Sequence, residues 1–99
     1  AASEVESVVI LSELVSECAV VGQRHYMLDE VPVVFVIPSA RGREMTDEKI
    51  SASIIELCTE NLPDFKVVRS VHIVDELPRS TLEKVAKNVL REKLPEITS

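Results

Sequence analysis

The segment Leu77–Val85 carries the lysine best suited to chemistry in this sequence. Its residues are Leu-Pro-Arg-Ser-Thr-Leu-Glu-Lys-Val, so a stiff, proline-led loop is expected to deliver Lys84 just before or at a helix start. If that helix begins at Ser80, Lys84 falls in its first turn, where the helix dipole disfavours a cation. A lysine placed against that preference suits the binding of phosphate or carboxylate oxygens. The alternative is an ordinary solvated lysine.

Other common catalytic and metal-binding patterns are missing from the sequence. The two histidines, His25 and His72, have no Cys, Asp or Glu at a recognised metal-ligand spacing, so no metal site is predicted. Two glycines are too few for a phosphate-binding glycine loop, and no GxSxG nucleophile elbow exists. Adjacent acidic pairs indicate solvated surface. Lys87 and Arg91 follow Lys84 at helical spacing and are interpreted as surface charges.

Charge is distributed unevenly along the 99 residues. The net charge of −6 argues against a nucleic-acid partner, and aromatic side chains make up only 3% of the sequence. Residues 1–78 carry 6 basic and 14 acidic side chains, a net of −8, whereas residues 79–99 carry 5 basic and 3 acidic ones, a net of +2. A short cationic segment on an acidic body favours a small anionic ligand over a polymer. A solvated basic helix face gives the same pattern.

The remaining composition is that of one soluble globular domain. The longest apolar run, Val31–Pro38, is too short to span a membrane. Cys18 and Cys58 lie 40 positions apart, which allows one disulfide but favours free, buried thiols in a reducing cytoplasm. The sequence begins Ala-Ala-Ser without an initiator Met, so a fragment of a longer protein is expected.

Apolar periodicity and capping residues predict six elements. The expected elements are, in chain order, a helix over residues 4–13, strands over 18–21 and 31–37, a helix over 47–62, a strand over 67–74 and a helix from Ser80. Ser3–Glu6 and Ser80–Glu83 each have the form of a capping box, and Thr46 is the expected N-cap of the second helix. The strand Val31–Ile37 is apolar almost throughout, so it should be buried on both faces. In the third strand, His72 should face away from Val71.

This order of elements describes a small α/β (α+β) domain. We expect residues 1–99 to form a single domain in which about three helices pack on a three-stranded sheet. The organisation by itself names no function.

Four stretches together resemble a known family in order and spacing. Val74–Val85, with Leu90-Arg91 after it, resembles the last core motif of the adenylate-forming superfamily: "VDELPRT", a few variable positions, Gly-Lys, and a helix ending in "LR". Ala2–Glu6 resembles "SPxEVE", Val15–Gly22 resembles "VxEAAVVG", and Asp64–Arg69 resembles "YKVPR". That superfamily comprises acyl- and aryl-CoA synthetases, peptide-synthetase adenylation domains and firefly-type luciferases. The resemblance implies a C-terminal lid domain of an AMP-forming ligase, without its hinge and large N-terminal domain.

By this resemblance, the parent enzyme activates a small carboxylic acid in two steps. ATP and the acid give an acyl-adenylate and pyrophosphate; the domain then reorients on its own N-terminal adenylation domain, and coenzyme A takes the acyl group. Lys84 is expected to contact the carboxylate and phosphate oxygens in the first step, because a positive charge offsets the negative charge that develops there. Lys66 and Arg69 are expected near the coenzyme A nucleotide in the second step, or else are ordinary turn charges. Mg²⁺ is expected on the large domain, and the enzyme in the cytoplasm.

Three places depart from the family pattern. Glu83 stands where Gly usually precedes the lysine, a feature that resembles synthetases of the carnitine- or crotonobetaine-CoA ligase kind and places a carboxylate beside Lys84. Residues 23–30 replace the common "VPDxxxGE" and keep only its final Glu. Val68 stands where "YKVPR" has Pro.

Two alternatives stay open at this point. A freestanding α/β binding or interaction module can share this fold without catalysis, and an adenylation subdomain can serve a carrier-protein thiol in place of coenzyme A. In the favoured interpretation the isolated domain is inactive, because the ATP and acyl pockets lie mainly on the large domain.

Overall fold

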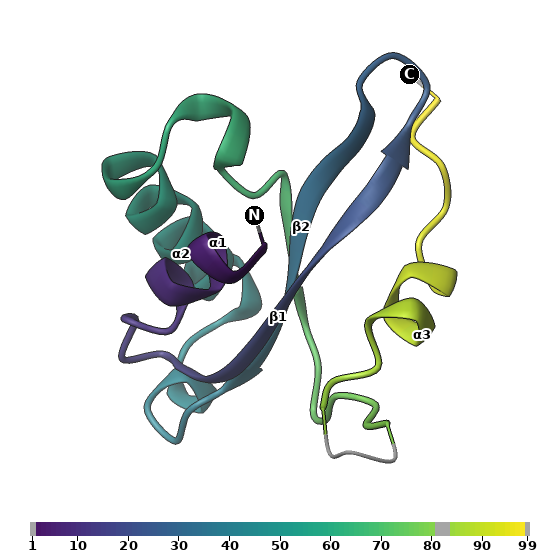
Figure 1. Cartoon of the computed structure of the whole chain (residues 1–99). Coiled ribbons are helices and arrows are strands. Elements are labelled where there is room, and N and C mark those ends of the chain that lie inside the picture. Colours follow the sequence, from purple (N-terminus) through teal and green to yellow (C-terminus); the bar gives the residue numbers. More distant parts are fainter. Residues whose placement is uncertain (1, 81–83, 99) are drawn as a thin grey trace.

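The computed structural model describes residues 2–80 and 84–98 and has the expected order of elements (Figure 1). In chain order the elements are α1 (Ala2–Val9), β1 (Val15–His25), β2 (Asp29–Pro38), the 3₁₀ turn η1 (Gly42–Glu44), α2 (Asp47–Asn61), the 3₁₀ turn η2 (Asp64–Lys66), β3 (Ser70–Ile73) and α3 (Lys87–Glu92). The predicted α+β class, with helices packed on a three-stranded sheet, is confirmed.

The sheet has the order β1-β2-β3, with β2 in the centre. β1 and β2 form an antiparallel hairpin, and β3 lies parallel to β2. Val34 of β2 is aligned with Val20 on one side and with Val71 on the other. Parallel neighbours need a crossover connection, and α2 supplies it between β2 and β3.

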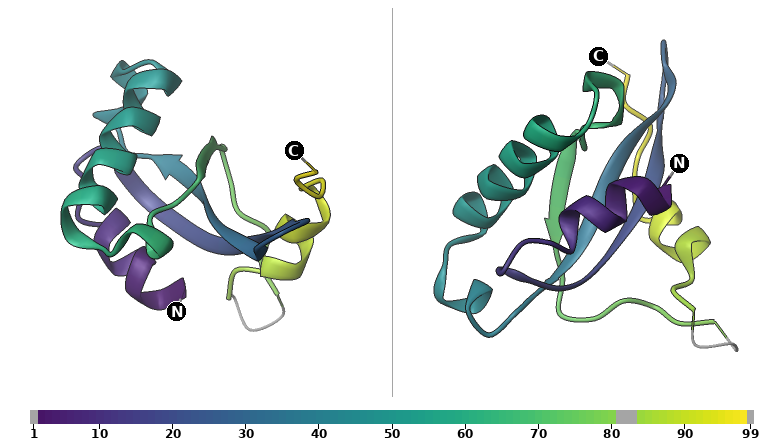
Figure 2. Two further views of the ribbon diagram at one scale, coloured as in Figure 1. Left: turned by 90° about the horizontal axis from the view of Figure 1, so that it is seen from above. Right: turned by 60° about the vertical axis from the view of Figure 1, so that its left-hand side comes forward.

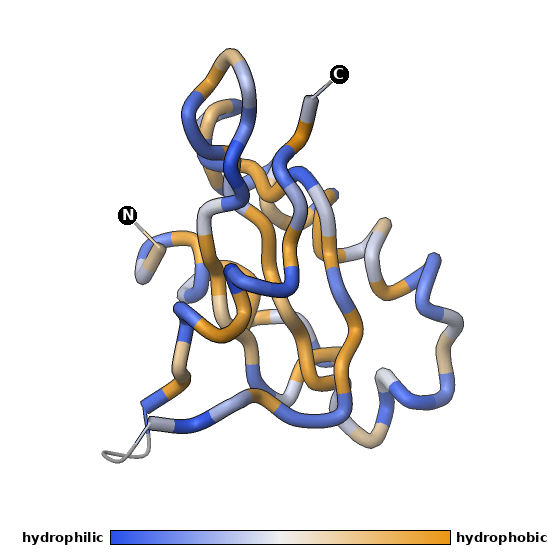
Figure 3. The backbone as a smooth tube through the Cα atoms, turned by 90° about the vertical axis from the view of Figure 1, so that its right-hand side faces the viewer, coloured by the Kyte–Doolittle hydropathy of each residue, from blue (hydrophilic) through white to orange (hydrophobic). Residues whose placement is uncertain are grey.

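The helices cover opposite faces of this sheet (Figure 2). α1 and α2 lie over a first core, and α3 with the segment after it lies over a second one. The first core includes Val5, Val9, Val20, Val34, Val36, Ile50, Ile54, Cys58 and Val68, and the second consists of Ala19, Val21, Val33, Phe35, Leu77 and Leu90. Alternate residues of β2 enter alternate cores, so this strand is buried on both faces, as predicted. Figure 3 shows the hydrophobic residues concentrated along the strands.

The first helix starts earlier and ends sooner than predicted. α1 ends at Val9 rather than at residue 13, because the N–H groups of Leu11 and Ser12 bond three residues back and tighten the last turn. Ser3 lies within the helix, so the predicted capping box is wrong. Its carbonyl accepts a hydrogen bond from the Ser7 hydroxyl at 2.8 Å.

Strand lengths follow pairing more than local composition. The apolar run predicts a strand only at Cys18–Val21, whereas β1 spans eleven residues because β2 pairs along nearly all of it. β3 is shorter than the predicted 67–74, since it begins at Ser70 after Val68 has turned into the first core. His72 and Val71 do lie on opposite faces, because His72 stacks on Phe35 of the second core.

α2 begins as its sequence indicates. Thr46 is its N-cap, and the Thr46 hydroxyl accepts from the Lys49 N–H at 3.2 Å. The helix ends at Asn61, one residue before the predicted end and two before Pro63. Its buried residues Ile50, Ile54 and Cys58 face the first core.

The turn between β1 and β2 needs a backbone conformation that few side chains adopt. Asp29 has a φ of 64°, in the left-handed region, and it stands where the pattern "VPDxxxGE" has Gly. Asp tolerates this region better than most residues. The His25 imidazole completes the turn, because its Nδ1 accepts from the N–H groups of Met27 and Leu28, each at 3.1 Å. The turn therefore forms without the glycine.

Both cysteines are free thiols, as predicted. Cys58 is buried and Cys18 is half-buried. Burial, followed by the nearby Glu6 carboxylate, raises the pKa of the Cys18 thiol to about 11. It therefore stays protonated at neutral pH and does not supply a thiolate nucleophile. Across residues 2–80 and 84–98, no helix has the length and apolar character needed to cross a membrane.

Gly42→Ala should destabilise the fold more than Gly22→Ala. A Cβ at Gly42 would lie 2.2 Å from the Leu14 carbonyl oxygen, a backbone atom, whereas a Cβ at Gly22 would meet only the end of the Glu30 side chain. We expect a loss of about 2 kcal/mol for Gly42→Ala and a change within about 0.5 kcal/mol for Gly22→Ala. Urea unfolding followed by circular dichroism measures both, and equal losses would contradict the close packing at Gly42.

Candidate functional site

Lys84 lies on an exposed bend between β3 and α3. The chain on its two sides is paired. The Ser80 N–H donates to the Lys84 carbonyl at 2.7 Å, and the Ala86 N–H donates to the Pro78 carbonyl at 2.8 Å. The two sides thus form a short antiparallel stem, with Lys84 at its outer end.

The last helix begins later than predicted. α3 starts at Lys87 rather than at Ser80, because the backbone groups on both sides of the stem are already used in extended pairing. Lys84 therefore precedes the helix, and the dipole of its first turn does not act against the lysine as expected. The second predicted capping box, Ser80–Glu83, includes residues 81–83, which lie outside the described part of the chain.

Ion pairs fix both sides of this stem to the body of the domain. Arg79 pairs with Glu17 on β1, and the Lys87 Nζ lies 2.9 Å from the Glu6 Oε2 on α1. The four side chains are 26–46% exposed, so each pair contributes at most about 1 kcal/mol to stability. Their main effect is to set where the stem lies.

Glu6 also protects the edge of the sheet. β1 is an edge strand, so its outer N–H groups have no neighbouring strand to bond. The Val20 N–H donates to the Glu6 Oε2 at 2.8 Å, the same oxygen that holds Lys87. One carboxylate therefore joins α1, β1 and the start of α3.

These anchors are not among the residues predicted for the site. Glu6, Glu17 and Arg79 belong to three of the stretches that resemble the family, but the partners Glu17 and Arg79 are 62 positions apart. Opposite charges at fixed places in separate motifs were the only signal in the sequence. Lys87, interpreted there as a surface charge, is an anchor.

Lys66 is already engaged by a carboxylate. Its Nζ lies 2.5 Å from the Glu4 Oε2 and 5.6 Å from the centre of the Phe65 ring. The hydrogen bond from Lys66, together with its charge, holds the pKa of Glu4 below its usual value. Lys66 lines a groove of about 370 Å³ that Lys87 and Arg91 also line.

Arg69 lies in a different groove. Its backbone N–H donates to the Pro32 carbonyl at 2.7 Å, which places it beside the start of β2. Within the described ranges, no carboxylate forms an ion pair with its guanidinium. The groove has a volume of about 930 Å³ and is also lined by His72 and Lys93.

His72 lies in the wall of the Arg69 groove. Its ring stacks on Phe35 with the ring centres 4.9 Å apart, and its Nε2 is hydrogen-bonded to the Ser70 hydroxyl at 3.1 Å. Burial lowers the pKa of His72 from its ordinary value of 6.5. The ring is therefore neutral at physiological pH.

The three predicted site residues are not brought together. Lys66 and Arg69 line separate grooves, and both precede β3, whereas Lys84 follows the other end of that strand. A single phosphate or carboxylate therefore cannot contact Lys84 and Arg69 at the same time. No three His, Cys, Asp or Glu side chains gather to hold a metal ion within residues 2–80 and 84–98.

Comparison with known proteins identifies the domain. Residues 4–84 match the AMP-binding enzyme C-terminal domain, and this match ends at the lysine on the stem. The chain belongs to this family. The resemblance that the four motifs carry is therefore confirmed.

Several relatives of this AMP-binding enzyme C-terminal domain are CoA ligases. The 3-[(3aS,4S,7aS)-7a-methyl-1,5-dioxo-octahydro-1H-inden-4-yl]propanoyl:CoA ligase of Mycobacterium tuberculosis is 42% identical over 90 residues, which are 91% of this chain and 17% of that protein. The 2-succinylbenzoate–CoA ligase of Bacillus cytotoxicus is 33% identical over 94 residues, 95% of this chain and 18% of that protein. The chain thus spans under a fifth of the length of these relatives.

Solved structures agree with this assignment. ATP-bound MatB from Rhodopseudomonas palustris superposes with a TM-score of 0.80 at 33% identity, covering 93% of this chain and 17% of that one. An anthranilate CoA ligase in complex with anthranoyl-AMP gives a TM-score of 0.81 at 30% identity, again covering 93% of this chain and 17% of the other. Use of ATP is therefore a property of the family.

Replacing Glu6 should separate its two tasks. Glu6→Gln keeps an acceptor for the Val20 N–H but loses the charge that holds Lys87, so we expect a loss of about 0.5–1 kcal/mol. Glu6→Ala loses both and should cost about 1–3 kcal/mol. Urea unfolding measures the losses, and amide exchange at Val20 should speed up only in Glu6→Ala. The control is Glu44→Gln, at an exposed residue outside this network. If Glu44→Gln lost as much stability as Glu6→Ala, the assignment would be contradicted.

Stability should fall as the pH is lowered through the ordinary histidine range. The unfolded chain takes up a proton at His72 that the half-buried ring resists, so the unfolded state binds more protons and the free energy of unfolding decreases. This loss begins near the unfolded pKa of about 6.5 and ends once the pH is below the lowered folded pKa. His72→Gln should make the dependence shallower, as measured by urea unfolding from about pH 7.5 to 5.5. An unchanged dependence, or an NMR titration of His72 above its ordinary pKa, would contradict it.

Proposed function

We propose that this chain is the C-terminal lid domain of an ATP-dependent, AMP-forming acyl-CoA synthetase. The family match that runs to Lys84 is the observation that carries the proposal. The CoA ligases among its relatives support it. The alternative of a freestanding interaction module is not favoured, because the relatives named above are CoA ligases and the chain matches only part of each of them.

In the proposed reaction, a carboxylate oxygen attacks the α-phosphorus of ATP. The products are an acyl-adenylate and pyrophosphate. The thiol of coenzyme A then attacks the acyl carbon, loses its proton and displaces AMP. The domain acts together with a large N-terminal adenylation domain, which supplies the ATP and acyl pockets and the Mg²⁺ site.

Lys84 is the residue that we assign to the first step. It is exposed at the outer end of an anchored stem, and within the described part of the chain no carboxylate forms an ion pair with it. Its ammonium group is thus free to contact the oxygens on which negative charge develops. Lysine suits this task because it is a compact charge on a flexible chain that can leave when the domain turns.

Arg69 is the better of the two candidates for the coenzyme A nucleotide. Lys66 forms an ion pair with Glu4, whereas Arg69 has no carboxylate partner among the described residues. A guanidinium can hold a phosphate through two parallel hydrogen bonds. We therefore assign Arg69 the main contact and Lys66 a secondary one. We also propose a cytoplasmic location, with which the two free thiols are compatible.

Lys84→Ala in the full-length protein should slow acyl-adenylate formation about 10²–10³-fold, the loss typical of removing one electrostatic stabiliser. ATP–pyrophosphate exchange measures this step. Lys49→Ala is the matched control, because Lys49 is an exposed lysine on α2, far along the chain from the stem. A Lys84→Ala rate within a few-fold of wild type would contradict the assignment.

Arg69→Ala should act on the other half of the reaction. We expect the KM for coenzyme A to rise about tenfold or more while ATP–pyrophosphate exchange stays unchanged, because a charged contact to phosphate contributes about 1.5–3 kcal/mol. Lys93→Ala, a change in the same groove, is the comparison. Unchanged thioester kinetics in Arg69→Ala would reject this role.

A further inference from the structure

A groove beside α2 is separate from every residue assigned so far. It has a volume of about 450 Å³ and lies between the turn after α1, the loop after β2 and one side of α2. None of its lining residues lines the groove of Lys66 or that of Arg69. The groove therefore shares no described lining residue with the two grooves proposed to contact nucleotides.

The groove exposes large apolar side chains. Leu11 is 70% exposed and Met45 is 39% exposed, on opposite loops, and the half-buried Leu14 and Leu57 also line the groove. Single exposed apolar residues are common on protein surfaces. Here two exposed and two half-buried apolar side chains line one concave site, which is the arrangement that buries a bulky side chain of a partner.

The rim of the groove is acidic. Glu56 and Glu60 lie one helical turn apart on α2, where like charges repel each other, and neither forms an ion pair within residues 2–80 and 84–98. The one cation in the lining, Arg41, is paired with Glu13 at 3.6 Å. Three carboxylates and one guanidinium leave a net charge of −2 beside these apolar side chains.

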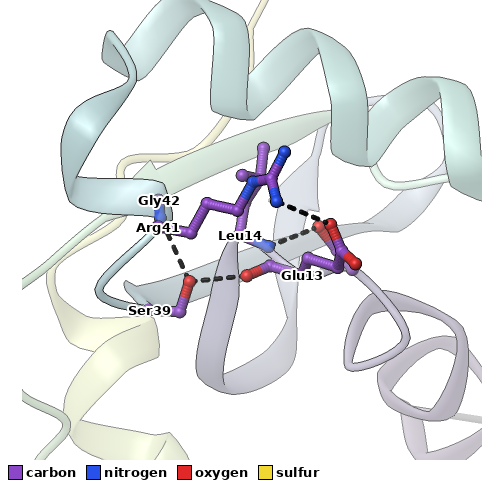
Figure 4. A network of polar contacts seen from close by, with 6 residues as sticks. Glu13, Leu14, Ser39, Arg41 and Gly42 are labelled. Atoms are coloured by element: carbon purple, nitrogen blue, oxygen red, sulfur yellow. Dashed lines mark hydrogen bonds and ion pairs between the residues drawn. The ribbon is translucent and has the colours of Figure 1, made fainter.

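The two loops that line the groove are locked together (Figure 4). The Ser39 hydroxyl donates to the Glu13 carbonyl at 2.6 Å and accepts from the Gly42 N–H at 3.1 Å. The Ser39 N–H donates to the Leu14 carbonyl at 2.9 Å. The groove is therefore formed before any partner arrives, which lowers the entropic cost of binding.

We propose that this groove docks a short basic segment of a partner protein, in which a bulky apolar side chain is flanked by lysines or arginines. The apolar residue contacts Leu11, Met45 and Leu57. The basic residues lie over Glu56 and Glu60, whose repulsion they relieve. This charge complementarity selects a cationic partner over an acidic peptide or an anionic membrane surface.

The test uses the ¹⁵N-labelled 99-residue chain, which has its own two packed cores. The probe is acetyl-Lys-Lys-Leu-Lys-Lys-amide, and the matched peptide has Ala in place of Leu. We expect saturable NMR shifts centred on Leu11, Met45 and Leu57, and binding of the leucine peptide about tenfold tighter than that of the alanine peptide. Shifts centred elsewhere, or equal affinities of the two peptides, would overturn the proposal.

Variants separate the groove from general acidity. The double variant Glu56→Gln/Glu60→Gln should weaken binding of the leucine peptide about fivefold, and it should fold at least as well as wild type because it removes a like-charge repulsion. The control Glu48→Gln changes an exposed residue of α2 that does not line the groove and should stay within about twofold. An equal loss in both variants would reduce the effect to net charge and reject the groove.

Two further measurements address other occupants. Sedimentation of the chain alone should show a monomer; a dimer abolished by Glu56→Gln/Glu60→Gln would show that a second copy fills the groove and would overturn the proposal. Hydrogen exchange on the full-length protein should leave the 53–60 face as accessible as in the isolated chain. Protection there would assign the groove to another part of the same protein, again against the proposal. Neither result depends on whether the enzyme forms acyl-CoA.

Discussion

The carboxylate of Glu6 is the contact on which the placement of the lysine stem depends most. An edge strand leaves backbone N–H groups without strand partners. In β1, the Val20 N–H instead donates a hydrogen bond to the Glu6 carboxylate on α1. The same oxygen holds Lys87. α1 packs into the first core through Val5 and Val9. The ion pair between Glu6 and Lys87 therefore fixes the start of α3 relative to that core. A stem that would otherwise be tied only to the second core is thereby tied to both.

Arg79 and Glu17 repeat this arrangement on the other side of the stem. Neither ion pair is buried enough to contribute much to the free energy of unfolding. The two large apolar clusters stabilise the fold, and the ion pairs determine where the stem lies. This division of labour fits a domain whose proposed lysine must reach a fixed point on another domain and later leave it. Rigid placement of the stem and free rotation of the Lys84 side chain are both needed for that task.

The sequence predicts the parts of this fold that are set locally or by burial. Periodicity locates α2 and the doubly buried β2, and Thr46 caps its helix as expected. Backbone pairing determines the remaining element boundaries. β1 is far longer than its apolar run because it pairs with β2, and α3 starts late because the backbone groups before Lys87 are hydrogen-bonded in the stem. The motifs indicate that Lys84 matters, but ion pairs between residues 62 positions apart cannot be read from charge alone. The separation of Lys66 and Arg69 into two grooves likewise depends on how the chain turns before β3.

A charge swap between Glu17 and Arg79 tests most directly whether the anchors place the lysine. In the full-length protein, Glu17→Arg and Arg79→Glu should each slow ATP–pyrophosphate exchange about tenfold, since a loop displaced by even a small distance loses its aligned contact. The double variant restores an ion pair of reversed sense and should recover the rate to within about threefold of wild type. Single variants with normal rates, or a double variant as slow as the two losses combined, would contradict the claim that this contact positions Lys84.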